Sequence, residues 1–201
     1  MDTPLYGLVL VGGRSQRMGQ DKAWLDYRGL PQWRYLVNLL QGHCAQVYLS
    51  VHEPEAARPY GDCPTLVDRY AYPGPINGLL SAFALHGEAA WLVLACDLPG
   101  FSEAAISRLI RQRDRRCLAT AFRNPETSSP EPLAAIWEPS SRVVLEEAAA
   151  AGQYSPRRVL EGHPVHCLHP ENPRHLANVN TPAEAIAFRQ QRSASSPSFS
   201  A

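Results

Sequence analysis

The chain has 201 residues, and its 19 lysines and arginines balance 19 aspartates and glutamates to a net charge of zero. This length fits one α/β domain or two very small ones, and the 45% of hydrophobic residues are ordinary for a globular domain with a real core. Zero net charge argues against a surface built to bind nucleic acid or an anionic membrane, but it leaves room for a local cluster of cations.

Three further features favour a cytoplasmic protein without a membrane partner. The longest apolar runs, Leu8–Val11 and Trp91–Cys96, are far shorter than the roughly 18 residues of a membrane helix. The first residues include Asp2 and no basic side chain, unlike a secretory signal peptide. The five cysteines are odd in number and contain no CxxC pair, which indicates reduced thiols.

Strand and helix signals alternate along the first 115 residues. Short apolar runs predict buried strands at 5–11, 46–51, 65–67 and 91–95. Apolar periodicity and capping signals predict helices at 31–40, 77–86 and 103–113, the last capped by Ser102. Such alternation is typical of a doubly wound, partly parallel sheet whose ligands bind at the carboxyl ends of the strands.

The remaining elements follow in the second half of the chain. Strands are predicted at 117–122, 133–137 and 165–168. Helices are predicted at 140–151, 155–161 and 182–191, the last with Thr181 as its cap. We expect one domain over residues 1–191, because there is no internal repeat or linker, and a disordered tail over residues 192–201.

The strongest local signal is the segment LVLVGGRSQRMGQDK, residues 8–22. A strand runs into Gly12 and Gly13, where backbone N–H groups can approach a ligand closely. Arg14, Arg17 and Lys22 follow within nine residues and can neutralise a polyphosphate. The segment is neither a Walker A loop nor a GxGxxG loop. The simpler alternative is an ordinary surface loop with scattered charges.

Four motifs resemble those of the MobA-like nucleotidyltransferase family and occur in the same order. GGRSQRMGQDK is similar to the pattern LAGGxSxRMGxDK, with Val11 in place of its first alanine. VDRYAYPGPINGLLSA is similar to the D…GPLxG segment, LACDLP to the strand-end aspartate motif, and NVNTPAE to N-x-NTPE/D. The matches span residues 5 to about 188. The resemblance implies a single-domain α/β fold that is Rossmann-like and three-layered, with a mostly parallel, mixed sheet of the nucleotide-diphospho-sugar transferase type.

The resemblance also implies a reaction in which a nucleotide is transferred to a phosphorylated acceptor and pyrophosphate is released. In the guanylyltransferase branch the substrates are GTP and molybdopterin, with or without molybdenum, and the product is the guanine dinucleotide form of the molybdenum cofactor. Other proteins of molybdenum-cofactor biosynthesis are implied as partners. The attacking phosphate is already anionic near neutral pH, so the chemistry needs alignment and charge neutralisation rather than a general base.

The nucleotide-binding residues implied by the resemblance come from several motifs. They are Leu10, Val11, Gly12, Gly13, Arg14, Lys22, Ser50, Asp68, Gly78 and Asp97. Lys22 would bind the phosphates, Arg14 and Arg17 would assist, and Lys22, Arg17 and Asp97 are the implied catalytic residues. Ser50 stands where some members carry a nucleotide-contacting asparagine, which leaves that contact open.

A magnesium site is implied at Asp97, because Mg²⁺ prefers carboxylate and phosphate oxygens. Asn180 is the second implied metal ligand, and Asn178, Asn180 and Arg157 are candidates for the acceptor side. The side chains of the two asparagines point to the same side of the chain only if their segment is extended. Simpler alternatives are a turn or cap for the aspartates, a helix start for the asparagines, and a surface basic pair for Arg157 and Arg158.

Two further segments leave alternatives open. His163, His166 and His169 suggest zinc, but on a strand His166 faces away from the other two, so we expect a structural or incidental role. Some guanylyltransferases carry a His-Pro segment near the position of Glu131. We expect Glu131, as a departure from that pattern, to alter the acceptor side of the site.

Three rival functions also stay open. The first is a cytidylyltransferase that acts on molybdopterin, although its strand-end motif more often resembles GDQP. The second is another small-phosphate nucleotidyltransferase, and the third is a nucleotide-binding module without turnover.

Overall fold

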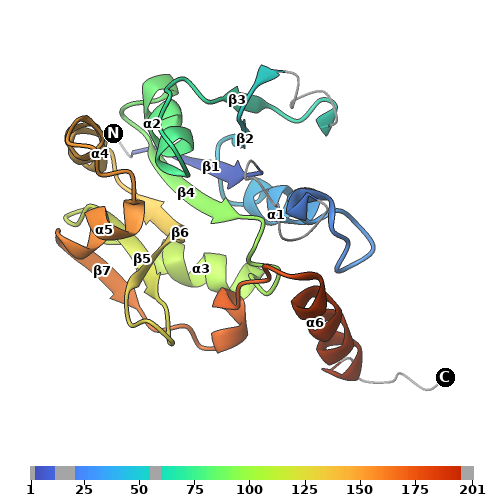
Figure 1. Cartoon of the computed structure of the whole chain (residues 1–201). Coiled ribbons are helices and arrows are strands. Elements are labelled where there is room, and N and C mark those ends of the chain that lie inside the picture. Colours follow the sequence, from blue (N-terminus) through green and yellow to red (C-terminus); the bar gives the residue numbers. More distant parts are fainter. Residues whose placement is uncertain (1–2, 12–20, 55–59, 196–201) are drawn as a thin grey trace.

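The computed structural model describes residues 3–11, 21–54 and 60–195 (Figure 1). The predictions for Gly12, Gly13, Arg14 and Arg17 therefore lie outside the described residues, as do residues 196–201 of the tail predicted at 192–201. The described cysteines are all free thiols. None of the helices in this part of the chain has the length and apolar character needed to cross a membrane.

In the described residues, seven strands form one mixed sheet in the order β3-β2-β1-β4-β6-β5-β7. The strands are β1 Leu5–Leu10, β2 Val47–Val51, β3 Thr65–Val67, β4 Ala90–Ala95, β5 Ala119–Arg123, β6 Pro130–Trp137 and β7 Val165–Leu168. The first four pair in parallel, β6 is antiparallel to β4 and β5, and β7 is parallel to β5. This confirms the predicted mixed α/β sheet.

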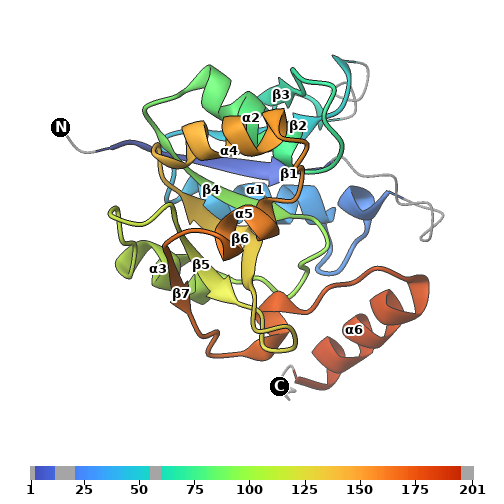
Figure 2. The same cartoon turned by 60° about the vertical axis from the view of Figure 1, so that its left-hand side comes forward.

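Helices cover both faces of the sheet (Figures 1 and 2). They are η1 Lys22–Trp24, α1 Gln32–Gln41, α2 Ile76–Leu85, α3 Glu103–Arg111, α4 Ser141–Ala150, α5 Pro156–Glu161, η3 Pro173–Leu176 and α6 Pro182–Ser195. One apolar cluster joins α1 and α3 to the sheet, and a second joins α2, α4 and α5 to its other face. These are the three predicted layers.

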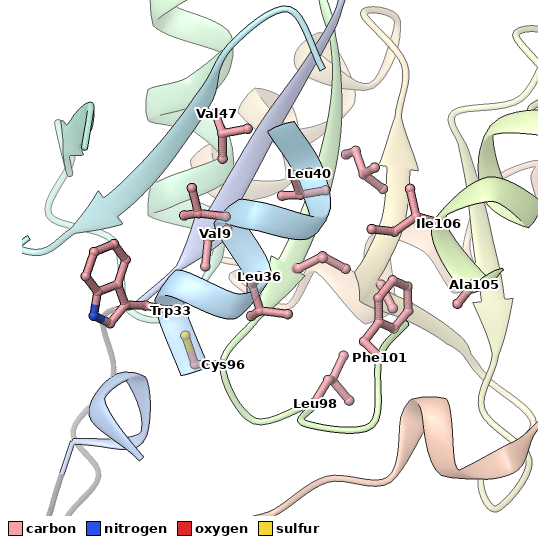
Figure 3. Packing of buried hydrophobic residues seen from close by; sticks show 14 of the residues in the cluster. Val9, Trp33, Leu36, Leu40, Val47, Cys96, Leu98, Phe101, Ala105 and Ile106 are labelled. Carbon is pink, nitrogen blue, oxygen red and sulfur yellow. The ribbon is translucent and has the colours of Figure 1, made fainter. Parts of the chain in front are cut away.

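The alternation of side chains along β1 shows how both faces are filled. Val9 belongs to the cluster under α1, whereas Leu8 and Leu10 belong to the cluster under α2. Figure 3 shows Val9 among Leu36 and Leu40 of α1. Successive strand residues point to opposite faces, so a central strand covered on both sides has to be apolar throughout.

Two element boundaries differ from the sequence prediction by three residues or more. Helix α6 continues to Ser195, so its predicted end at Gln191 is wrong, and residues 192–195 are helical rather than part of a tail. The segment after Gln191 contains neither glycine nor proline before Pro197, so nothing stops the helix there. Strand β6 begins at Pro130, three residues before the predicted start.

The parallel strands bring their carboxyl ends to one edge of the sheet. Leu10 pairs with Ser50 at the ends of β1 and β2, and Asp68 and Asp97 follow β3 and β4. A distant segment joins them, because the Val179 N–H donates to the Asp97 carbonyl at 2.9 Å. Residues from five parts of the chain therefore meet at this edge.

Candidate active site

A cavity of about 930 Å³ lies over the carboxyl ends of the parallel strands. It brings together all the described residues predicted to bind nucleotide, namely Leu10, Val11, Lys22, Ser50, Asp68, Gly78 and Asp97. Their roles stay predictions, but their meeting in one cavity does not follow from sequence spacing. It follows from the parallel order of β1 to β4.

Gly78 lets α2 approach the sheet closely. A Cβ atom at this position would lie 2.6 Å from the Ser50 Oγ atom and 2.8 Å from the Leu10 Cδ2 atom, closer than real Cβ contacts. A larger residue would push the start of α2 away from β1 and β2. Packing at the cavity wall is therefore enough to explain this glycine.

Asp68 lies in a polar group at the ends of β2 and β3. Its Oδ1 accepts a hydrogen bond from the Ser50 hydroxyl at 3.2 Å, and its Oδ2 is 3.6 Å from His52 Nδ1. Burial raises the pKa of Asp68, while Ser50 and His52 act in the opposite direction. Ser50 thus contacts Asp68. His52 was not predicted, although its i+2 spacing from Ser50 could have placed it on the same side.

Asp97 and Lys22 provide opposite charges in the same cavity. Burial raises the pKa of Asp97, and the Lys22 ammonium opposes that shift. Lys22, the only lysine in the sequence, opens η1, where Asp21 caps the turn by accepting from the Ala23 N–H at 3.0 Å. The Lys22 Nζ atom donates to Asn180 Oδ1 at 2.5 Å. This bond joins residues from opposite ends of the chain.

A second cavity of about 450 Å³ adjoins the first. It contains all three predicted acceptor-side residues, Asn178, Asn180 and Arg157. Asp97 lines both cavities. The carboxylate predicted to hold a metal therefore stands where the two spaces meet.

The asparagine segment shows the alternating burial that an extended chain would give. Val179 is buried, and Asn178 and Asn180 on either side of it are exposed. The hydrogen bond from Val179 to Asp97 holds this segment against the end of β4. Alternation in an extended chain puts both amides on the cavity side.

Arg157 comes from the first turn of α5. Ser155 caps this helix by accepting from the Arg158 N–H at 3.4 Å, and Pro156 occupies the first turn, as predicted. Arg157 lines the smaller cavity and pairs with the buried Glu131 at 3.2 Å, whereas Arg158 is exposed and lines neither described cavity. The simpler alternative of a surface basic pair therefore suits Arg158 but not Arg157, which lines a cavity.

The histidine segment shows no metal-binding arrangement. The described residues contain no group of three or more His, Cys, Asp or Glu side chains that could hold an ion. His163 Nδ1 instead lies 2.8 Å from the Val159 carbonyl oxygen. His166 lies on β7, as the strand prediction for 165–168 required.

The fold and its cavities define a three-layer α/β protein whose ligand site lies over the carboxyl ends of parallel strands. Residues 7–169 match the model of the MobA-like NTP transferase domain. The chain belongs to this family.

Relatives from other organisms agree with that assignment. The chain is 36% identical over 183 residues to a molybdenum cofactor biosynthesis bifunctional protein from Synechocystis sp., a match that covers 90% of this chain and 53% of that protein. It is 34% identical over 184 residues to a molybdenum cofactor guanylyltransferase from Pseudomonas fluorescens, with 89% and 90% covered. The chain thus spans about half the length of the first relative and most of the second.

A solved structure shares the fold. The molybdopterin-guanine dinucleotide biosynthesis protein A from Archaeoglobus fulgidus superposes with a TM-score of 0.77 at 20% identity. The match covers 94% of this chain and 99% of that chain. At this identity the likeness concerns the fold alone.

Proposed function

We propose that the chain is a molybdenum cofactor guanylyltransferase, which transfers GMP from GTP to molybdopterin, with or without molybdenum, and releases pyrophosphate. The observation that carries the proposal is the position of Asp97, which lines both a larger cavity with Lys22 and a smaller cavity with Arg157. The 34% identity to a relative with this name supports the choice of substrates. The free thiols support a cytoplasmic location.

The reaction joins two anions. An oxygen of the acceptor phosphate attacks the α-phosphorus of GTP, and the bond from that phosphorus to the oxygen bridging to the β-phosphate breaks. The attacking phosphate needs no base near neutral pH, so the protein has to align the reactants and reduce their repulsion. Two adjoining cavities suit this task, with GTP in the larger one and the acceptor phosphate in the smaller one.

Lys22 and Arg157 are the described cations for the two phosphate groups. An ammonium has three N–H donors, so Lys22 can keep its bond to Asn180 and still donate to the phosphates of GTP. Arg157 would donate to the acceptor phosphate from the other cavity. Asp68, with Ser50 beside it, would contact the nucleoside part of GTP.

The Asp97 carboxylate fits Mg²⁺ as the protein's contribution to a shared site. The described residues hold no metal-binding cluster of their own, so the ion would take further oxygens from phosphates and water, as Mg²⁺ commonly does. When bound, it would neutralise negative charge on the phosphates and on the leaving pyrophosphate. Asn180 stays only a predicted second ligand. Its Oδ1, the atom that would bind the ion, already accepts a hydrogen bond from Lys22.

The test is a transfer assay with the purified chain, molybdopterin, Mg²⁺ and either GTP or CTP. We expect the guanine dinucleotide and pyrophosphate from GTP alone, and a loss of about 100-fold or more in rate for Asp97→Asn. A cytosine dinucleotide would make the protein a cytidylyltransferase. GTP binding without a product would make it a nucleotide-binding module.

A second measurement reports on nucleotide binding without turnover. Because Lys22 is the only lysine, its ε-amine can be followed by mass spectrometry after mild acylation. We expect GTP with Mg²⁺ to slow acylation of Lys22 and CTP to have little effect. Equal acylation with and without GTP would remove Lys22 from the nucleotide site.

A further inference from the structure

Glu131 is a buried carboxylate for which the proposed reaction has no direct use. Because β6 runs antiparallel to β4, its start lies beside the carboxyl end of β4. This topology brings Glu131 into the smaller cavity together with Asp97. The Glu131 side chain is only 6% exposed. Burying a charged carboxylate to this extent costs folding free energy unless the group is paired. The partners of Glu131 therefore indicate its role.

The partners of Glu131 hold it in a fixed place. Its Oε2 accepts from Arg157 Nη2 at 3.2 Å, and the Asn124 side chain also bonds to the carboxylate. Burial raises the pKa of Glu131, Arg157 lowers it, and the negative charge of Asp97 raises it. Asn124 is itself tied to its loop, since its Oδ1 accepts from the Glu126 N–H at 2.9 Å. The carboxylate therefore belongs to a rigid wall.

Arg157 is the more exposed partner of the pair. Its side chain is 40% exposed and lines the smaller cavity. A guanidinium has five N–H donors in a planar fork, so one ion pair leaves others for a second anion. Arg157 can therefore stay paired with Glu131 while it binds a phosphate.

We propose that Glu131 is a positioning residue, which holds the Arg157 guanidinium in the wall of the smaller cavity and orients it for the phosphate of the acceptor. The inference rests on the proposed function, because it assigns that cavity to the acceptor. A guanidinium already fixed by a buried carboxylate loses less freedom when the phosphate arrives. The opposite arrangement, in which Glu131 competes with the phosphate for Arg157, predicts the opposite change in affinity.

The test compares steady-state kinetics of the full chain and of Glu131→Gln with GTP and molybdopterin. The glutamine keeps the shape and an acceptor oxygen but loses the charge. We expect the KM for molybdopterin to rise roughly tenfold, with the KM for GTP, kcat and Tm little changed. Glu131→Asp keeps the charge on a shorter side chain and should give an intermediate KM for molybdopterin. This variant replaces Glu131→Gln in the test if Glu131→Gln fails to fold.

A double-mutant cycle separates positioning from a general structural role. In an Arg157→Ala background, Glu131→Gln should add nothing to the KM for molybdopterin, because no guanidinium remains to be oriented. Arg158→Ala is the matched control, since this neighbouring arginine lines neither described cavity and should leave both KM values unchanged.

The outcomes that overturn the inference are distinct from those that overturn the proposed function. A lower KM for molybdopterin in Glu131→Gln would mean competition, and an unchanged KM would mean that the pair does not position Arg157. Equal increases in both KM values would mean a structural role. A wild-type chain without transfer activity would instead overturn the proposed function, and the positioning role with it.

Discussion

Asp97 has opposite effects on function and on stability. Burial raises its pKa in the folded protein, against the pull of Lys22. A carboxyl group with a raised folded-state pKa holds its proton more tightly in the folded chain than in the unfolded chain. Its ionisation therefore lowers the free energy of unfolding, beginning as the pH rises through the ordinary Asp value and remaining at neutral pH.

Asp97→Asn should therefore raise Tm near neutral pH while it strongly slows transfer. The gain should shrink as the pH falls below about 4, where the wild-type carboxyl is protonated in both states. Thermal unfolding followed by circular dichroism across this pH range measures the effect. Asp62→Asn, at an exposed position, is the control and should change Tm little. A lower Tm for Asp97→Asn near neutral pH would show that attraction to Lys22 outweighs the cost of burial.

At the scale of elements, a glycine after β4 controls how closely η3 approaches the site. A Cβ atom at Gly100 would lie 1.9 Å from the carbonyl oxygen of Arg174 in η3. Backbone cannot yield as a flexible side chain can. Because η3 leads directly into Asn178 and Asn180, a shift there would move both amides relative to Asp97.

Gly100→Ala should lower stability by about 1–3 kcal/mol, the usual cost of overpacking, and raise the KM for the acceptor more than the KM for GTP. Urea unfolding and steady-state kinetics measure the two effects. Gly42→Ala is the matched control, since an added Cβ meets no atom within 4 Å and the backbone φ there is −75°. Equal behaviour of the two variants would show that η3 moves aside without consequence.

At the scale of the whole molecule, one buried ion pair joins the helix layer to the sheet. Arg113, just after α3, makes two hydrogen bonds of 2.6 and 2.7 Å to Glu138, just after β6. The two side chains are 8% and 3% exposed. Removing one member leaves the other as a buried, unpaired charge.

Glu138→Ala should cost about 3–5 kcal/mol of unfolding free energy, measured by urea denaturation. The matched control is Glu146→Ala, which breaks the exposed pair of Arg142 and Glu146 within α4 and should cost about 0.5 kcal/mol or less. A similarly small loss of stability in both variants would contradict this prediction. It would mean that water solvates the Arg113 guanidinium once Glu138 is removed.

Much of the fold was predictable because its signals are local. The hydrophobic run of β4, the Ser102 cap of α3 and the proline in the first turn of α5 each act within a few residues. The predictions were wrong at the end of α6, where no glycine or proline stops the helix before Pro197, and at the start of β6, where Pro130 and Pro132 are residues that disfavour a strand. Individual motifs also identified Lys22 and Asp97 as site residues, although the sequence does not show that the two residues line the same cavity.

The sequence by itself determined the elements, the aspartates that follow strands, and the family resemblance, since these depend on short-range patterns and motif order. Only the tertiary structure decided which residues meet. The antiparallel insertion of β6 put Glu131 beside Asp97, and the chain returned after η3 to put Asn180 against Lys22. The physical reason is that strand order and register arise from packing of the whole sheet between its helices. No local periodicity encodes a contact between residues 158 positions apart.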